Sequence, residues 1–435
     1  MNTGLVTATL RLRHLVLFVL AVTAGILPAF SQSFGPVIPE EAGFSSERLA
    51  RLTSTLNAYA EQQRLSGGVA MVLRDGNAVF FESFGMRDVE AGDPMPKDAI
   101  FRIASQTKAI VSVAVMMLQE EGRLLIGDPV GKYLPEYSKT TVAVRDEDGG
   151  YTIADARRAV TIRDLLTHTA GIGYGYGTAA DLWKEAGIQG WYFADRDEPI
   201  RETVRRIAAL PHDAHPGERF VYGYATDILG VLVEEISGQP LDHFLESRIF
   251  EPLGMNDTHF YLPDTKTTRL AAVYSATDGP GIVRAADPGG SVGQGHYVNG
   301  PRKSFSGGAG LLSTANDYAR FLQMMLNGGE LDGYRILSPK TVELMTINHL
   351  TGISFRDGVG MGLGFDVVEH VGARGTPGAV GDYGWGGAYH STYWVSPADR
   401  LVVVFFTQLI PATGSDIHGK LRALIYQAMT GQAGK

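Results

Sequence analysis

Cysteine is absent from the 435-residue sequence. Disulfide bonds, thiolate nucleophiles and cysteine-ligated metal centres are therefore excluded, so covalent catalysis would need an oxygen or nitrogen nucleophile. The histidines form no His-x-x-x-His pair on an expected helix, and we interpret the stretch from His212 to His215 as a solvated loop. The sequence predicts neither a metal site nor a cofactor.

Long lysine or arginine runs are also absent, and the formal net charge is −9. Binding to a phosphate backbone requires a basic footprint, so nucleic acid is not an expected partner. The 44% of hydrophobic residues is typical of a globular protein. We expect a small-molecule ester or amide as substrate. Nothing in the sequence indicates an oligomeric state.

Two further motifs are missing, one of the α/β-hydrolases and one of the dinucleotide-binding proteins. No Gly-x-Ser-x-Gly elbow occurs, which disfavours the α/β-hydrolase fold. The glycines at 173, 175 and 177 lack the preceding strand and following helix of a dinucleotide-binding loop. We interpret them as part of a flexible loop that carries tyrosines.

The N-terminal residues have the pattern of a secretory signal peptide. Arg11 and Arg13 precede an apolar run from Leu15 to Leu27, and Ala29-Phe30-Ser31 is a plausible cleavage site. A membrane anchor is the alternative, but the run is short for a span. We expect residues 1–31 to be removed, leaving 32–435 exported to the periplasm or secreted, without stable membrane association. Cleavage would remove two arginines and no acid, changing the formal charge from −9 to −11.

Periodicity predicts strands near both ends of the mature chain and helices between them. Expected hairpins cover 68–84 and 392–407, and the expected helices cover 46–63, 161–166, 200–210, 226–237, 241–249, 315–326 and 416–429. We therefore predict a mixed α/β fold of the α+β type. An antiparallel sheet from both termini (about 40–110 and 330–435) would be flanked by helices, with a mostly helical insert at about 110–330.

Two long loops, 171–198 and 279–308, are candidates for the walls of a pocket. The first contains Tyr174 and Tyr176, which we list as candidate substrate-binding residues. Variable surface loops are the alternative interpretation, at about even odds.

Ser105 and Lys108 stand at the start of a segment that is apolar on every side, which predicts a buried helix. Three residues apart, they project from one face, so the lysine can reach the serine hydroxyl. An isolated Ser-x-x-Lys is weak evidence, because a helix-capping serine and a surface lysine give the same pattern. The surrounding sequence decides between the two.

The stretch Phe101-Arg-Ile-Ala-Ser-Gln-Thr-Lys108 resembles the β-lactamase-related serine hydrolases, which include class C β-lactamases, D-alanyl-D-alanine peptidases and family VIII carboxylesterases. Similar stretches follow in family order, namely 121–124, 128–135, 165–171, 216–222, 307–314 and 385–387. The resemblance covers roughly residue 43 to the C-terminus. It implies the β-lactamase/transpeptidase-like fold and an acyl-enzyme mechanism with Ser105 as nucleophile.

The resemblance also implies roles for residues far from Ser105. Tyr222 falls on the tyrosine of the family's second motif and would accept the serine proton, assisted by Lys108. The backbone N–H groups of Ser105 and Ala388 would form the oxyanion hole. Candidate substrate-binding residues of the second and third motifs are Tyr224, Trp385, Gly386 and Gly387. His168, in the 165–171 stretch, is interpreted as structural, and a role for His390 is only a guess.

Two departures from β-lactamases bear on the substrate. Tyr224 replaces the motif asparagine, and Trp385 replaces the motif lysine that can pair with a substrate carboxylate. The pattern resembles family VIII carboxylesterases, so we expect cleavage of short-chain acyl esters. The alternatives are a β-lactamase or D-amino-acid peptidase and, from another class, a non-catalytic penicillin-binding-like module.

Overall fold

The computed structural model describes Met1 and residues 34–431. The predicted signal peptide therefore lies outside the described residues, apart from Met1. From Phe34 onward the chain forms one unit. Among the described residues, none of the helices combines the length and the apolar character needed to cross a bilayer.

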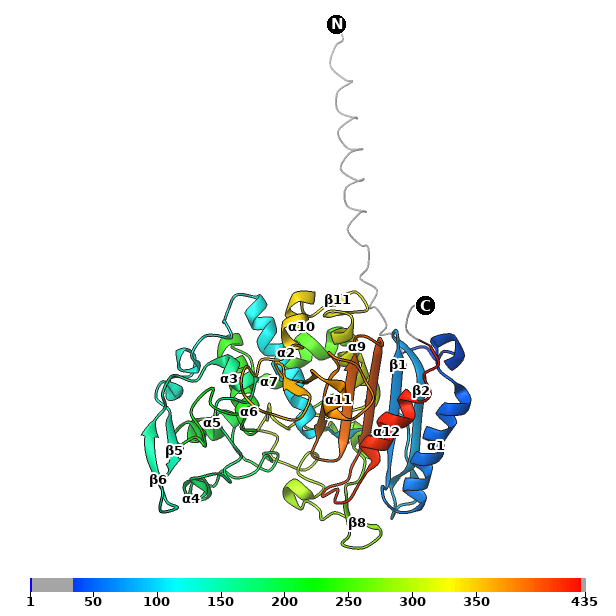
Figure 1. Cartoon of the computed structure of the whole chain (residues 1–435), viewed down its shortest axis with the longest axis horizontal. Coiled ribbons are helices and arrows are strands. Elements are labelled where there is room, and N and C mark those ends of the chain that lie inside the picture. The colour runs from blue at the N-terminus through cyan, green and yellow to red at the C-terminus, as the bar shows by residue number, and fades with distance from the viewer. Residues whose placement is uncertain (2–33, 432–435) are drawn as a thin grey trace. The chain divides into compact units, whose positions relative to one another are not determined.

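Within residues 34–431, eight strands form one antiparallel sheet built from both ends of the chain, as predicted (Figure 1). In spatial order the strands are β12 (Val359–Met361), β13 (Asp366–Val368), β14 (Tyr383–Gly387), β15 (Ser391–Ser396), β16 (Leu401–Thr407), β1 (Gly67–Arg74), β2 (Asn77–Asp88) and β3 (Asp93–Pro94). The first strand in sequence, β1, pairs with the last, β16, along its whole length. The two predicted hairpins are thereby joined at the centre of the sheet.

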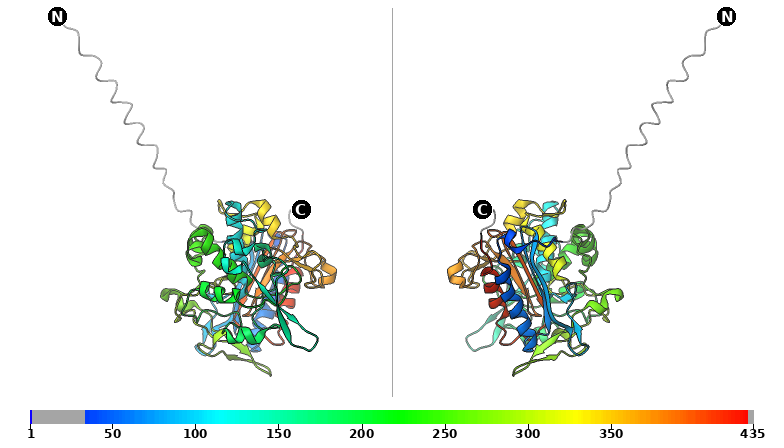
Figure 2. Two further views of the ribbon diagram at one scale, coloured as in Figure 1. Left: turned by 90° about the vertical axis from the view of Figure 1, so that its left-hand side faces the viewer. Right: turned by 90° about the vertical axis from the view of Figure 1, so that its right-hand side faces the viewer.

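Both faces of the sheet are buried, because side chains alternate between two cores. On β1, Met71 and Leu73 belong to the larger core, whereas Ala70 and Val72 belong to the smaller one. The smaller core is covered by α1 (Ser46–Glu61) and α12 (Ile417–Tyr426), which lie side by side in Figure 2. The larger core is covered by α2 (Thr107–Glu120) and α9 (Ala315–Leu326).

The remaining helices gather on the side of the sheet away from α1 (Figure 1). They are α3 (Ile162–Leu166), α4 (Ala180–Glu185), α5 (Ile200–Ala208), α6 (Ala225–Ser237), α7 (Leu241–Leu245) and α8 (Glu251–Leu253), with α10 (Pro339–Met345) and α11 (Val371–Arg374) nearer the sheet. Each predicted helix is present, with ends shifted by a few residues; the longest shift is in the 241–249 segment, where α7 continues into a π-turn. The division into a sheet part and a helical insert stays a prediction.

Short strand pairs interrupt the helical region. They are β4 (Phe101–Arg102) with β9 (Leu312–Ser313), β5 (Thr141–Arg145) with β6 (Tyr151–Asp155), β7 (Tyr274–Ala276) with β8 (Ile282–Arg284), and β10 (Glu330–Leu331) with β11 (Tyr334–Arg335). The pair β4–β9 matters most for function, because β4 leads directly into the turn that carries Ser105.

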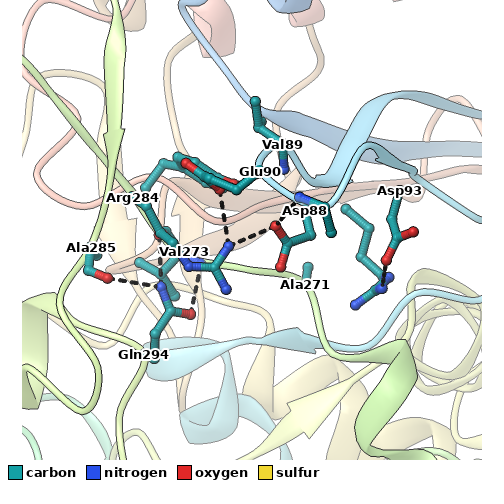
Figure 3. Close-up of polar contacts among 12 residues, drawn as sticks. Asp88, Val89, Glu90, Asp93, Ala271, Val273, Arg284, Ala285 and Gln294 are labelled. Carbon is teal, nitrogen blue, oxygen red and sulfur yellow. Dashed lines mark hydrogen bonds and ion pairs between the residues drawn. The ribbon is translucent and has the colours of Figure 1, made fainter.

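The loop 279–308 is attached to the end of β2 (Figure 3). Arg284 forms ion pairs with Asp88 and Glu90. The side-chain amide of Gln294 bonds both backbone groups of Val273 and the carbonyl of Ala285. No residue of this loop lines the cavity at Ser105. The expected role of this loop as a wall of that cavity was therefore wrong. Its first part is fastened to the end of β2, and its last residue, Gly308, lies behind Lys108 and not in the cavity lining.

Arg102 of β4 joins this loop to the catalytic side of the molecule. It is 3% exposed and donates hydrogen bonds to the carbonyls of Ala271 (2.7 Å) and Gln294 (2.8 Å) and to the side chain of Gln408 (3.2 Å). Burial lowers the pKa of the guanidinium. Its charge is thus stabilised by oxygen dipoles, with no carboxylate among these bonds.

Replacing Arg102 with Met should destabilise the protein strongly. The buried carbonyls of Ala271 and Gln294 would lose their donor, while the Gln408 side chain would keep only the backbone N–H of residue 102, and we expect the free energy of unfolding to fall by about 3 kcal/mol or more. The matched control is Arg284→Met, whose ion pairs are partly exposed and should cost less than about 1 kcal/mol. Urea denaturation measures the free energy of unfolding of both variants. Equal losses in the two variants would contradict the conclusion that the buried bonds of Arg102 stabilise the fold more than the ion pairs of Arg284.

Candidate active site

Ser105 lies in a single 3-10 turn, Ala104–Gln106, between β4 and α2. Ala104 has φ of 43°, a left-handed conformation that is unusual for a residue with a side chain. The strained turn is held from both sides, because β4 pairs with β9 and every residue from Thr107 to Leu118 of α2 is buried. Ser105 is half-buried and lines a cavity of about 980 Å³.

The Lys108 side chain is 2% exposed and its ammonium group has three oxygen acceptors. It lies 3.4 Å from Ser105 Oγ, 3.1 Å from the Tyr174 hydroxyl and 2.7 Å from the Gly308 carbonyl. An ammonium has three N–H donors, so this set satisfies all of them. The lysine therefore points at the serine, as the Ser-x-x-Lys spacing predicts, and holds its hydroxyl in one orientation.

Tyr222 reaches the same group through its ring. Lys108 Nζ lies 4.7 Å from the ring centroid, a cation–π contact. The Tyr222 hydroxyl accepts a hydrogen bond from Trp385 Nε1 (3.1 Å). Among the described residues it makes no direct hydrogen bond to Ser105 or Lys108; Tyr174 makes that bond instead. Ser105 and Tyr222 thus line one cavity, Lys108 contacts both from the buried side, and the roles of all three stay predictions.

Tyr174 and Tyr222 are distinguished by their surroundings. Burial, together with the nearby phenol of Tyr222 and carboxyl of Asp227, raises the pKa of Tyr174 well above its usual value. Tyr174 therefore keeps its proton, and its hydroxyl positions the lysine. Tyr222 is half-buried and lines the cavity, as Tyr174 does, but its hydroxyl is bonded to Trp385 and not to Lys108.

Asp227 of α6 supplies a buried negative charge behind the lysine, which sequence reasoning missed. It accepts hydrogen bonds from Ser306 Oγ (2.6 Å) and from Gly308 N (3.0 Å), while the Gly308 carbonyl accepts from Lys108. Burial raises the pKa of Asp227 and the Lys108 charge opposes that rise. One peptide group therefore links the carboxyl and the ammonium. The only available signal was its place five residues after Tyr222.

His168 is buried and packs against Tyr222, with ring centroids 4.7 Å apart and an interplanar angle of 55°. Burial and the charge of Lys108 lower the pKa of His168 well below its usual value, so the ring is neutral. Its Nδ1 atom has no hydrogen-bond partner among the described residues. The sequence predicts a hydrogen-bonded structural residue here; Nδ1 lacks such a bond among the described residues, and the structural role stays a prediction.

The third-motif strand, β14, passes directly over the serine turn. A Cβ on Gly387 would lie 2.5 Å from the Ile103 carbonyl, so only glycine permits this approach. β13 pairs with Tyr383 and Gly384 only, so within the described chain the edge of Trp385–Gly387 that faces away from β15 is unpaired. Ser105, Gly386, Gly387 and Ala388 all line the cavity. The site leaves an open strand edge beside the nucleophile, as an oxyanion hole formed with Ala388 requires.

Several aromatic side chains line the cavity. Tyr174, Trp191 and Trp385 line it, as does Phe355, which sequence reasoning did not single out. Tyr224 is fully buried behind Tyr174 and donates to the Gly190 carbonyl (2.6 Å), and Tyr176 is 69% exposed outside the lining. The structure therefore does not place these two tyrosines in the pocket. Tyr176 lies in a long loop whose sequence does not determine where its side chains point, and Tyr224 was assigned from its position in the second motif alone.

Comparison with known proteins agrees with this geometry. Residues 52–427 match the model of the Beta-lactamase family. The chain belongs to the beta-lactamase family. Esterase EstB of Burkholderia gladioli is 35% identical over 375 residues, covering 82% of this chain and 90% of EstB.

Solved structures of this family have the same fold. EstCE1, a hydrolase with promiscuous acyltransferase activity, superposes with a TM-score of 0.73 at 26% identity, covering 87% of this chain and 99% of EstCE1. Simvastatin synthase LovD of Aspergillus terreus has a TM-score of 0.75 at 22% identity, covering 89% of this chain and all of LovD, and shows the fold alone. The family and these relatives identify a serine hydrolase with the β-lactamase/transpeptidase-like fold.

Replacing Tyr174 with Phe should slow the reaction of Ser105 with a fluorophosphonate. The variant removes one of the acceptors that orient Lys108, and we expect the labelling rate to fall about tenfold. Tyr176→Phe is the matched control and should react like the unchanged protein. Mass spectrometry of the intact protein measures both rates. Equal rates for Tyr174→Phe and Tyr176→Phe would show that the hydroxyl of Tyr174 does not position the lysine.

Replacing Gly308 with Ala tests the link between Asp227 and Lys108. The added Cβ would lie 2.4 Å from Asp227 Oδ2, so the peptide that binds Lys108 has to move. A displacement of about 1 Å can cost about 100-fold in rate, and we expect a loss of that order in the fluorophosphonate labelling rate. The control is Gly279→Ala, whose Cβ meets nothing within 4 Å. Undiminished labelling of a folded Gly308→Ala variant would contradict the proposed link.

Proposed function

We propose that the protein is a carboxylesterase that cleaves short-chain acyl esters through an acyl-enzyme on Ser105. The observation that carries this proposal is Trp385. An indole stands where the lysine of the third motif would bind a substrate carboxylate, and its N–H is bonded to Tyr222. The pocket next to the scissile bond is therefore aromatic and neutral at this position, which suits an uncharged ester.

The mechanism follows from the positions of the side chains. Ser105 Oγ attacks the ester carbonyl carbon while Tyr222, acting as its phenolate, accepts the hydroxyl proton and becomes the neutral phenol, and the oxyanion is bound by the N–H groups of Ser105 and Ala388. The C–O bond to the alcohol then breaks as Tyr222 returns the proton to the leaving oxygen. Water repeats the sequence on the acyl-enzyme and releases the carboxylic acid. Lys108 stays in place throughout as the group that orients Ser105 and faces the Tyr222 ring.

The relatives favour the same activity. Besides EstB, a lovastatin esterase of Penicillium rubens is 27% identical over 306 residues, covering 69% of this chain. An Escherichia coli protein named as a candidate D-alanyl-D-alanine carboxypeptidase is 24% identical over 90% of this chain, which supports the peptidase alternative. That alternative and a β-lactamase would use the same Ser105. We also propose export, on the pattern of residues 11–31, with no nucleic-acid partner.

A substrate panel tests the proposal. We expect p-nitrophenyl acetate and butyrate to be cleaved with a burst of p-nitrophenol, and the catalytic efficiency on both to exceed that on a chromogenic cephalosporin and a D-Ala-D-Ala peptide. Ser105→Ala should lower ester turnover by about 1000-fold or more, because it removes the nucleophile. Ester turnover that survives this substitution would eliminate the proposal. Higher efficiency on the cephalosporin or the peptide would favour the alternatives.

A further inference from the structure

The cavity that contains Ser105 continues beyond Trp385 to a charged end. Arg356, on the loop before β12, and Arg374, the last residue of α11, both line it. These residues come from outside the family motifs that built the catalytic centre. α11 and the start of α12 flank this part of the molecule (orange and red in Figure 1).

Arg356 rests on the aromatic wall. Its guanidinium lies 4.3 Å from the ring centroid of Phe355 and 5.4 Å from that of Trp385, and these two rings stack at an interplanar angle of 11°. One terminal nitrogen donates to Asp366 Oδ2 at 2.6 Å. The side chain is 52% exposed. Its direction is thus fixed by two rings and one carboxylate, while further N–H donors remain available to a ligand.

Arg374 has no such partner. Its side chain makes no hydrogen bond or ion pair with any residue of the part of the chain that the structure describes, whereas its backbone N–H donates to the His370 carbonyl (3.0 Å). It is half-buried, and burial together with the charge of Arg422 and Arg356 lowers its pKa, which Asp366 and Asp382 oppose. An uncompensated guanidinium beside two other arginines is a place where a bound anion is stabilising.

Two of the acidic residues at this end of the cavity are paired with arginines. Asp366 is paired with Arg356, and Asp382 is paired with Arg422 at 2.7 Å. Asp357 also lines the cavity, but it is exposed to solvent. After these pairs are formed, Arg374 is the cation that is left within the described lining, with Arg356 beside it.

We propose that Arg356 and Arg374 bind a carboxylate in the alcohol part of the ester, so that the substrates are acyl esters of hydroxy acids. The inference rests on the proposed esterase function. Arg356 lies on Trp385, whose indole bonds Tyr222, the group that returns the proton to the leaving alcohol. This end of the cavity therefore faces the leaving group. The carboxylate takes no part in bond breaking and is released on the free hydroxy acid.

The aromatic wall sets the spacing of such a substrate. The guanidinium of Arg356 lies over the stacked rings of Phe355 and Trp385, and Trp385 belongs to the strand edge that lines the cavity together with Ser105. A carboxylate directly beside the scissile bond, as in a β-lactam, would meet the indole. A carboxylate attached through a flat spacer could reach Arg356 while the spacer stacks on the two rings. The proposed selectivity therefore depends on the distance between the carboxylate and the ester bond as well as on the charge of the carboxylate.

A pair of isosteric esters tests the inference. The substrates are 4-carboxyphenyl butyrate and the neutral 4-carbamoylphenyl butyrate, and the measured quantity is the ratio of their kcat/KM values. We expect Arg374→Gln and Arg356→Gln each to lower this ratio about tenfold, chiefly through KM of the carboxylate ester, because a remote charge contributes to binding before and during reaction. Added NaCl should lower the ratio of the unchanged protein in the same direction.

The matched control is Arg157→Gln, an arginine with a 72% exposed side chain that does not line the cavity, and it should leave the ratio unchanged. Arg374→Gln carries the most weight, because Arg374 has no partner whose loss could disturb the fold. A ratio that is the same in Arg374→Gln and Arg157→Gln would overturn the inference while leaving the esterase proposal intact. Failure to cleave either ester, or cleavage that persists in Ser105→Ala, would instead overturn the proposed function itself.

Discussion

The site depends on one buried ammonium group. Lys108 is 2% exposed, and its charge is held by the hydroxyls of Ser105 and Tyr174 and by the carbonyl of Gly308. Burying a cation without oxygen partners would cost far more than a single hydrogen bond contributes, so these acceptors have to stay in place. Their arrangement connects three separate parts of the chain, at residues 105–108, 174 and 308. The requirement to satisfy Lys108 therefore fixes the position of the nucleophile.

The surrounding fold can be understood from that requirement. α2 is buried on every side, so the lysine near its start cannot turn to solvent. Asp227, on the neighbouring helix α6, contributes negative charge through the Gly308 peptide. The glycine is required because a Cβ there would collide with the carboxylate. The central sheet contributes Gly387, whose missing side chain lets β14 cross the strained turn at Ala104.

Much of this was predictable from the sequence. The alternation of strand residues and the turn residues predicted the β1–β2 and β15–β16 hairpins. The spacing of Ser105 and Lys108 on an apolar helix predicted their contact. Both patterns depend on local geometry.

The tyrosines were less predictable. Tyr224 is buried and Tyr176 is exposed, whereas Tyr174 binds the lysine. Side-chain direction in a long loop is decided by distant contacts, such as that of Tyr224 with the Gly190 carbonyl. No sequence motif marks the charged end of the cavity, because Arg356 and Arg374 are brought together only by the fold.

The most direct test of this account is the reactivity of Ser105 when Lys108 is replaced by Met, a side chain of similar length without charge. The intact mass of the folded variant is followed after addition of a fluorophosphonate. The account predicts no adduct in the time that the unchanged protein takes to react completely, because the serine hydroxyl has lost the group that orients it. An adduct on Ser105 that forms at the unchanged rate in folded Lys108→Met would contradict the central role of the buried ammonium.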